Sequence, residues 1–340
     1  MIKRIAFLGY NEPDGKTFGN GVERVIYNQA QMLKERGYEI LYYHLFSRTQ
    51  YKGLNRFLRE KAIDVAVWHM TSLKVKGRLH TPCPLICLWH STPFFKRNLF
   101  HGLFNGAMFT YITACADKMV LLSAGFVTRF FPAKIFPKKV VAIPNFLSDE
   151  LIHQEVDLGQ KKKEVLFVGR LDNKVKRIDL LLRVWLKIEE AVDDWSLNIC
   201  GEGGDESMLK QMAADLGLKR VCFRGFVEPK EFYKTASVFC MTSAIEGMPM
   251  VLEEAASFGC VPLAFDSFES VSELITDGEN GRLIQPFDVD AFAKALLELM
   301  KNECERTRLS VNTKRDVKRF DPEGIMSQWE CLFEEVERKQ

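Results

Sequence analysis

Apolar runs and amphipathic helical patterns alternate along the whole chain. In the first 150 residues, several runs rich in Val, Ile, Leu and aromatic residues carry few polar positions, which is typical of strands buried on both faces. Between these runs, apolar residues recur at helical spacing. This order predicts parallel strands covered by helices. We expect strands at 3–10, 38–46, 63–70, 85–90, 117–123 and 140–145, and helices at 22–37 and 51–62.

The same order starts again after a polar segment. Residues 151–163, LIHQEVDLGQKKK, have few apolar positions and are typical of a linker. The pattern therefore predicts an α/β fold with two Rossmann-like domains, at residues 1–150 and 164–315, and a C-terminal helical segment at 316–340. In the second half we expect strands at 164–169, 196–201, 221–226, 237–243 and 261–266, and helices at 177–192, 205–217, 229–236 and from about 288 onward.

The longest stretch without Asp, Glu, Lys or Arg covers residues 98–116. It contains Asn, His, Thr and Gly, which disfavours a membrane-spanning helix and favours a buried one. An alternative concerns the residues just before it, where Lys96 and Arg97 stand among phenylalanines. A segment of this composition can also dip into the surface of a bilayer.

Composition and charge narrow the class of protein. The chain of 340 residues is 47% apolar and 27% charged, as expected for a soluble globular protein. Nine cysteines, several of them within apolar runs, indicate reduced, buried thiols, and the N-terminus has no signal-peptide pattern. We therefore expect a cytoplasmic protein, with a peripheral location at the inner face of the membrane as the alternative. No Cys or His spacing typical of a structural zinc site is present, so no metal is expected.

Charge is distributed unevenly between the two halves. The net charge is +2, but residues 1–150 carry 21 Lys and Arg against 10 Asp and Glu, whereas the remainder carries 26 against 35. A basic first half fits a nucleic acid, an anionic membrane surface or a phosphorylated substrate, and scattered solvated charge would give the same count.

Two glycine-containing segments resemble phosphate-binding loops without meeting their requirements. Residues 9–17, GYNEPDGKT, have one residue too many between the first Gly and the Gly-Lys pair of a P-loop. Residues 201–206, GEGGDE, lack the third Gly of a dinucleotide-binding turn. Neither segment is expected to bind a cofactor.

Two carboxylates flank the predicted start of a helix in TSAIEGMPMVLEEAASFG, residues 242–259. Glu246 and Glu254 are eight positions apart, so on one helix their side chains would diverge by roughly 80°. The pattern instead places Glu246 on a loop, Pro249 in the first helical turn and Glu254 more than a turn further along. The free N–H groups of the helix N-terminus then open between two acids.

Two cations follow a strand of the same half. Arg170 lies at the end of the predicted strand 164–169, and Lys176 lies just before the next helix. Ligands of open α/β sheets bind at this carboxyl edge, and an Arg with a Lys suits a diphosphate. The helix N-terminus provides a second site for the anionic diphosphate. The two acids beside it can accept hydrogen bonds from sugar hydroxyls, so together these groups match a nucleotide-sugar.

These residues give the chain a resemblance to retaining GT-B glycosyltransferases of the family 4 type. The resemblance covers nearly all of the chain and is strongest over 165–290, where Glu246 and Glu254 form the E-x7-E element in family order with FVGRLDNKVKRIDLLL and ICGEGGDESMLK. It implies a GT-B fold whose two parallel sheets face each other across a cleft. It also implies that the last helix crosses back to the first domain and that the linker lets the cleft close.

The resemblance implies a role for each matching residue. Glu246 would hold the hydroxyls of the donor sugar, and Glu254 would accept from the ribose hydroxyls. Arg170 and Lys176 would neutralise the leaving diphosphate without a metal. The backbone of the helix N-terminus would assist them, at Gly247, Met248, Pro249, Met250 and Val251.

In the first half the family match is looser. FGNGVER resembles the family's glycine-rich loop, in which Gly19 and Gly21 would let the backbone approach donor and acceptor. His90, in LWHST, would lie beside the sugar, and Asn145 would contact the other domain. Arg177 departs from the family, which more often has Gly after the lysine.

The resulting hypothesis is a metal-independent hexosyltransferase that retains the anomeric configuration. Its donor would be a nucleotide-diphosphate sugar and its acceptor a glycan, a lipid-linked or a phosphorylated molecule, in polysaccharide or glycolipid biosynthesis. An anionic membrane surface is a possible partner and nucleic acid is not expected. The alternatives are a non-catalytic nucleotide- or glycan-binding module and a sugar-nucleotide epimerase.

Overall fold

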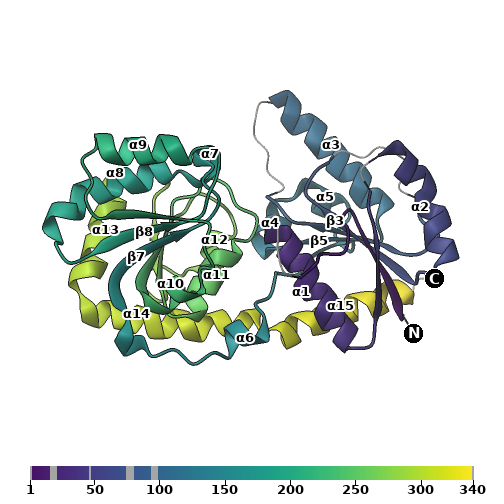
Figure 1. The fold of residues 1–340 in the computed structure, drawn as a ribbon. Helices are drawn as coiled ribbons and strands as arrows, with labels where there is room; N and C mark the ends of the chain where they lie inside the picture. Colours follow the sequence, from purple (N-terminus) through teal and green to yellow (C-terminus); the bar gives the residue numbers. More distant parts are fainter. Residues whose placement is uncertain (1, 16–20, 46, 74–79, 93–98, 339–340) are drawn as a thin grey trace. The chain divides into compact units, whose positions relative to one another are not determined.

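The computed structural model describes residues 2–15, 21–45, 47–73, 80–92 and 99–338, with only the backbone for 99–103. The chain forms two compact units (Figure 1). Unit 1 contains residues 1–146 and 322–340, and unit 2 contains residues 147–321. The C-terminal residues therefore belong to the first unit, and the polar segment 151–163 belongs to the second.

Unit 1 is built on a parallel sheet of six described strands in the order β2-β1-β3-β4-β5-β6. Alternate residues of the central strands face one apolar cluster, for example Ala66 and Trp68 of β3 and Leu85 and Cys87 of β4. Its strands are β1 Arg4–Leu8, β2 Glu39–Tyr43, β3 Val65–Met70, β4 Leu85–Trp89, β5 Lys118–Leu121 and β6 Val140–Ala142.

Helices connect these strands and cover the sheet (Figure 1). The C-terminal helix α15 joins them: Arg36, just after α1, binds Glu323 of α15 at 2.5 Å, and Lys118 of β5 binds Glu335 at 2.5 Å. The helices of unit 1 are α1 Gly21–Glu35, α2 Arg48–Glu60, α3 Leu99–Cys115, α4 Ala124–Arg129, α5 Phe131–Ile135 and α15 Pro322–Glu337.

Unit 2 has the doubly wound strand order β12-β11-β10-β7-β8-β9, again parallel among the described residues. Alternate strand residues such as Val165 and Phe167 of β7 face one large apolar cluster with α8, α9 and α13. The strands are β7 Lys162–Val168, β8 Ser196–Cys200, β9 Val221–Gly225, β10 Ala236–Met241, β11 Val261–Phe265 and β12 Arg282–Ile284.

Short helices precede and separate these strands. The α-helices of unit 2 are α6 Asp149–Ile152, α7 Asn173–Lys176, α8 Ile178–Ile188, α9 Glu206–Asp215, α10 Lys230–Thr235, α11 Met250–Ser257, α12 Val271–Leu274, α13 Val289–Lys301 and α14 Glu303–Asp316. The 3-10 helices are η1 Leu158–Gln160, η2 Glu189–Ala191 and η3 Val317–Phe320. The α/β class with two Rossmann-like units is confirmed.

The prediction of a buried helix at residues 98–116 is only half right. The segment forms α3, whose Phe109 and Ile112 are buried in unit 1. On the other side of the same helix, Phe104 is 58% exposed and Tyr111 is 41% exposed. No helix within the described residues is long and apolar enough to span a membrane.

Candidate functional site

The predicted cations and acids of unit 2 lie at the switch point of its sheet. β7 and β10 are neighbours in the middle of the sheet, and the chain winds outward from them in opposite directions. Doubly wound sheets bind ligands at the carboxyl ends of such a strand pair. Arg170 and Lys176 follow β7, and Glu246 follows β10. The strand order therefore brings together residues that are about 70 positions apart in the sequence.

Lys176 and Glu246 form the central ion pair of this site. The distance between Lys176 Nζ and Glu246 Oε1 is 2.6 Å, and the two side chains are only 17% and 13% exposed. A pair that is this shielded from water interacts more strongly than one on the open surface.

Backbone and side-chain hydrogen bonds hold the two loops that carry this pair. The amide of Ala244 donates to the carbonyl of Val175 at 2.8 Å, and Thr242 Oγ1 donates to the carbonyl of Lys176 at 2.9 Å. The amide of Asn173, at the start of α7, donates to Asp205 at 2.7 Å. The loop after β10 is therefore fixed directly to α7.

Arg177, at the position where the family that the chain resembles more often has Gly, adopts a left-handed backbone conformation. Its φ of 49° and ψ of 46° lie in the left-handed region, which costs a non-glycine residue roughly 1 kcal/mol. Its guanidinium binds Asp179 at 3.0 and 3.1 Å and lies 5.4 Å from the ring centre of Phe287. These contacts offset the strain, so the departure from the family leaves the turn after Lys176 intact.

The N-terminus of α11 opens between Glu246 and Glu254. The helix begins at Met250, so Pro249 is its N-cap and lies one position outside the first turn that the sequence predicted. Because Pro249 has no N–H, backbone donors of the predicted segment can come only from Gly247, Met248, Met250 and Val251. The carbonyl of Gly247 is already occupied, since it accepts from Ser270 Oγ at 2.6 Å.

Glu254 is more enclosed than a simple surface acid. Its side chain is 3% exposed, and Oε2 accepts a hydrogen bond from the hydroxyl of Tyr233 at 3.1 Å. Tyr233 comes from α10, and its ring stacks on Phe258 with centroids 5.7 Å apart. No motif in the sequence marks this tyrosine, whose hydrogen bond fixes the orientation of Glu254.

Arg170 is the most exposed of the four predicted cations and acids of unit 2. Its side chain is 73% exposed and its guanidinium lies 3.4 Å from Asp172. An exposed pair of this kind contributes little to stability. The guanidinium is therefore available for an anionic ligand at the sheet edge.

Close backbone packing accounts for two of the glycines in GEGGDE. A Cβ at Gly201, whose φ is +136°, would come within 2.0 Å of the carbonyl oxygen of Gly169. A Cβ at Gly203 would come within 2.5 Å of the carbonyl oxygen of Leu171. Only glycine lets this turn approach the backbone next to Arg170.

In unit 1, His90 is paired with a second histidine, His69, which no sequence motif marks. His90 follows β4 and His69 lies in β3; His69 Nδ1 and His90 Nε2 are 3.0 Å apart. Both rings are buried, which lowers the pKa of His90 to about 3 and that of His69 well below its usual value. The pair therefore stays neutral at physiological pH.

The surroundings of His69 select the tautomers of this pair. Within the described residues, His69 Nε2 is buried and has no hydrogen-bond partner. Burying an N–H group without an acceptor costs more free energy than burying a ring nitrogen lone pair without a donor. His69 Nδ1–H is therefore the donor and His90 Nε2 the acceptor, which leaves the proton of neutral His90 on Nδ1.

The other predicted residues of unit 1 are less informative. Gly19 and the pair Lys96 and Arg97 lie outside the described residues. Gly21 is the first residue of α1 and has open space where a Cβ would be. Asn145 is buried and lines a small pocket of unit 1 with Gln29.

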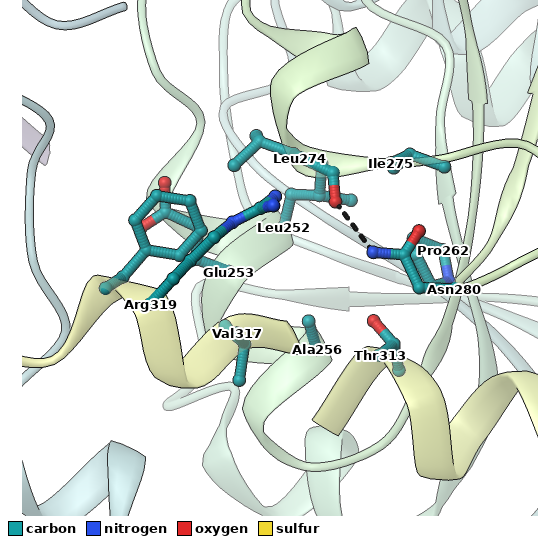
Figure 2. Close-up of a pocket in the computed structure, with 11 residues that line it drawn as sticks. Leu252, Glu253, Ala256, Pro262, Leu274, Ile275, Asn280, Thr313, Val317 and Arg319 are labelled. Atoms are coloured by element: carbon teal, nitrogen blue, oxygen red, sulfur yellow. Dashed lines mark hydrogen bonds between the residues drawn. The ribbon is translucent and has the colours of Figure 1, made fainter. Parts of the chain in front are cut away.

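A second acid of α11 lies away from the ion pair. Glu253 lines a small pocket between α11, α12 and η3, together with Arg319, Asn280 and Thr313 (Figure 2). Its carboxylate is buried, and among the described residues neither oxygen has a hydrogen-bond partner. Burial, with the neighbouring Glu254, raises the pKa of Glu253 well above its usual value.

Comparisons with known proteins point to glycosyltransferases. Residues 148–316 match the family described as glycosyl transferases group 1, which is nearly all of unit 2. The chain is 25% identical to an uncharacterised glycosyltransferase of Haemophilus influenzae, over 98% of this chain and 100% of the relative.

A second relative and a solved structure extend this comparison. The chain is 26% identical, over 89% of this chain and 84% of the relative, to a Campylobacter jejuni enzyme. That enzyme is named as an α-1,4-N-acetyl-D-galactosaminyltransferase of a diphosphoundecaprenol-linked glycan. The structure of Anabaena Alr3699/HepE with UDP and glucose covers 98% of this chain and 100% of its own, with a TM-score of 0.77 and 16% identity. At that identity the likeness concerns the fold.

Proposed function

We propose that this chain is a glycosyltransferase of the group 1 family and that it transfers a hexose from a nucleotide-diphosphate sugar with retention of the anomeric configuration. The observation that carries the proposal is the shielded pair of Lys176 and Glu246 at the switch point of unit 2. A cation and an acid held side by side match a phosphate and a sugar hydroxyl that are neighbours in such a donor.

The diphosphate would bind to the cations and to the N-terminus of α11. Lys176 and Arg170 supply positive charge, and the amides of Met250 and Val251 supply donors at the positive end of the helix dipole. Charge that develops on the leaving diphosphate during the reaction would be stabilised by these fixed groups. They would thereby do without a metal what a divalent cation does elsewhere.

Donor binding would exchange the partners of the ion pair. In the ligand-free site Lys176 neutralises Glu246. With a donor present, a phosphate oxygen becomes the better partner for Lys176, and Glu246 becomes free to accept from hydroxyls of the hexose. Glu254, oriented by Tyr233, would accept from the ribose hydroxyls.

Retention follows if the acceptor attacks on the face that the diphosphate leaves. A leaving phosphate oxygen next to the incoming hydroxyl can take its proton, so no separate protein base is required on the opposite face. His90 would assist as a neutral donor through Nδ1–H, because its pKa of about 3 keeps it uncharged.

The acceptor class is proposed from charge and from the relatives. Residues 1–150 are strongly basic, which suits an acceptor that carries phosphate. The Campylobacter relative is named for a diphosphoundecaprenol-linked acceptor. We therefore favour a lipid-linked glycan bearing a phosphate over a free oligosaccharide.

Turnover of UDP-, GDP- and ADP-sugars, with and without EDTA, tests the proposal. Glu246→Gln and Lys176→Met should lower donor turnover by a hundredfold or so, since each removes charge that acts on the reacting groups, and EDTA should have no effect. Lys174→Met is the matched control, because Lys174 is exposed on the same short helix α7. Unchanged turnover in both site variants would refute the assignment. Isomerisation of a sugar-nucleotide without any acceptor would indicate an epimerase. Binding of a nucleotide-sugar without turnover of any member of the panel would indicate a non-catalytic module.

A further inference from the structure

An exposed apolar surface lies on unit 1, formed by α3 and α5, which pack against each other (Figure 1). Phe104 and Tyr111 of α3 are 58% and 41% exposed, and Phe131 and Ile135 of α5 are 58% and 48% exposed. We call these residues, with Ala107, the α3/α5 face. Large apolar side chains concentrated on two packed helices mark an interaction site more often than single exposed residues do.

The sequence of α3 makes this surface unusual. Its 17 residues contain no Asp, Glu, Lys or Arg, although a helix at a protein surface normally carries charge on its outer side. Phe104, Ala107 and Tyr111 are spaced three and four residues apart, and all three are exposed. They therefore form one continuous apolar stripe along the helix.

The segment that contains α3 and α5 is rich in positive charge. Between residues 99 and 139 the chain has five Lys and Arg but a single acid, Asp117, whose carboxylate accepts from the amide of Leu85 at 2.8 Å. Two of the cations serve the fold: Lys118 binds Glu335, and Lys139 donates to the carbonyls of Ala114 and Ala116.

The remaining three cations are exposed around α5. They are Arg129, Lys134 and Lys138. Aromatic and aliphatic side chains bordered by exposed cations match the surface of an anionic bilayer, in which rings enter the interface and cations meet lipid phosphates.

We propose that the α3/α5 face docks unit 1 on an anionic lipid bilayer. A second copy of this chain fits the face less well. A two-fold interface would bring together two copies of a surface that carries exposed cations, while the only acid of residues 99–139, Asp117, already accepts from Leu85, and like charges repel. The inference goes beyond the proposed function because docking requires neither donor nor acceptor. It would hold the enzyme where a lipid-linked acceptor resides.

Flotation of the full chain with vesicles tests this surface. The vesicles are phosphatidylcholine alone, or phosphatidylcholine mixed with phosphatidylglycerol, without any acceptor lipid. The wild type should float with the mixed vesicles, and salt should weaken the association. Phe104→Ser combined with Phe131→Ser should reduce binding by roughly tenfold or more, because both rings leave the interface. Lys134→Gln combined with Lys138→Gln should reduce it by about fivefold for each cation removed.

Matched variants in unit 2 control for a general loss of charge or apolar surface. Phe226→Ser removes a ring that is 78% exposed, and Lys174→Gln removes an exposed cation. Both should bind vesicles as the wild type does. Turnover of a donor with soluble acceptor should persist in all variants, which separates failure of docking from failure of the proposed function.

Three outcomes would overturn the proposal. The first is a wild type that does not float with anionic vesicles. The second is undiminished flotation of the Phe104→Ser, Phe131→Ser variant. The third is a dimer by light scattering that becomes a monomer in that variant, since a second copy would then cover the face.

Discussion

Replacing both buried histidines of unit 1 should remove much of its sensitivity to mild acid. His69 and His90 contact each other inside the sheet, and burial is the largest cause of the lowered pKa of each. In the unfolded chain a histidine has a pKa of about 6.5. As pH falls from 8 to 5, His69 and His90 therefore bind protons in the unfolded state but not in the folded state.

The size of the effect follows from linkage. A lowered pKa means that stability is fully present above the unfolded value and is lost as pH falls toward the folded value. At pH 5 the folded ring of His90 is still neutral, because its pKa is about 3. The decrease in the free energy of unfolding between pH 8 and pH 5 then depends only on the pKa of the unfolded state, and it amounts to about 2 kcal/mol for each histidine. For the two histidines together the decrease is about 4 kcal/mol.

The free energy of unfolding of unit 1 can be measured separately from that of unit 2 by urea unfolding, with hydrogen exchange followed in peptides from β3 and β4. The variant with His69→Gln and His90→Gln should lose about 4 kcal/mol less than the wild type between pH 8 and pH 5. His153→Gln is the control, because this histidine is 68% exposed. If the double variant kept the wild-type pH dependence, or if His153→Gln reduced it equally, the reasoning about the buried pair would be refuted.

Two further substitutions test the packing of unit 2. Glu253→Gln should raise the unfolding temperature at pH 8 by about 2–4 °C, because a buried carboxyl with a raised pKa destabilises the folded protein as pH rises. At pH 5 the increase in unfolding temperature should be smaller. A lower unfolding temperature of the variant at both pH values would contradict the burial argument. Gly201→Ala should destabilise unit 2 by about 3 kcal/mol or more, since its Cβ would clash with the carbonyl of Gly169. Calorimetry measures this, and Gly204→Ala, where a Cβ meets nothing within 4 Å, should have little effect.

The sequence predicted those features that depend on local pattern. Runs of apolar residues identified the central strands, because strands of a parallel sheet are buried along their whole length. The positions of Lys176 and Glu246 after two strands indicated a shared sheet edge. Their contact at 2.6 Å depends on the strand order, in which β7 and β10 are neighbours.

Features that depend on tertiary contacts were not predicted. The pairing of His69 with His90 arises from the alignment of β3 with β4, and no spacing in the sequence encodes it. Tyr233 reaches Glu254 from a helix of six residues whose pattern carried no functional signal. β12, with three residues, is too short for apolar periodicity to mark it.

The uncharged helix α3 shows a limit of hydropathy patterns. A segment without charge is expected to be buried, since exposed helices normally carry charged residues. Here one side of the segment packs into unit 1 while Phe104 and Tyr111 remain exposed. The same composition is compatible with burial in protein and with contact to lipid. Only the exposed fractions of the individual side chains of α3 distinguish these two environments.

We expect Lys176 to anchor a diphosphate at the switch point of unit 2, and calorimetric titration with UDP, GDP and ADP measures this directly. For the nucleotide that binds, Lys176→Met should weaken affinity by about tenfold to a hundredfold. The variant loses a charged hydrogen bond and leaves Glu246 unneutralised beside the phosphates. Lys174→Met should bind as the wild type does. Equal affinity in wild type and Lys176→Met, or an equal loss in Lys174→Met, would contradict the account.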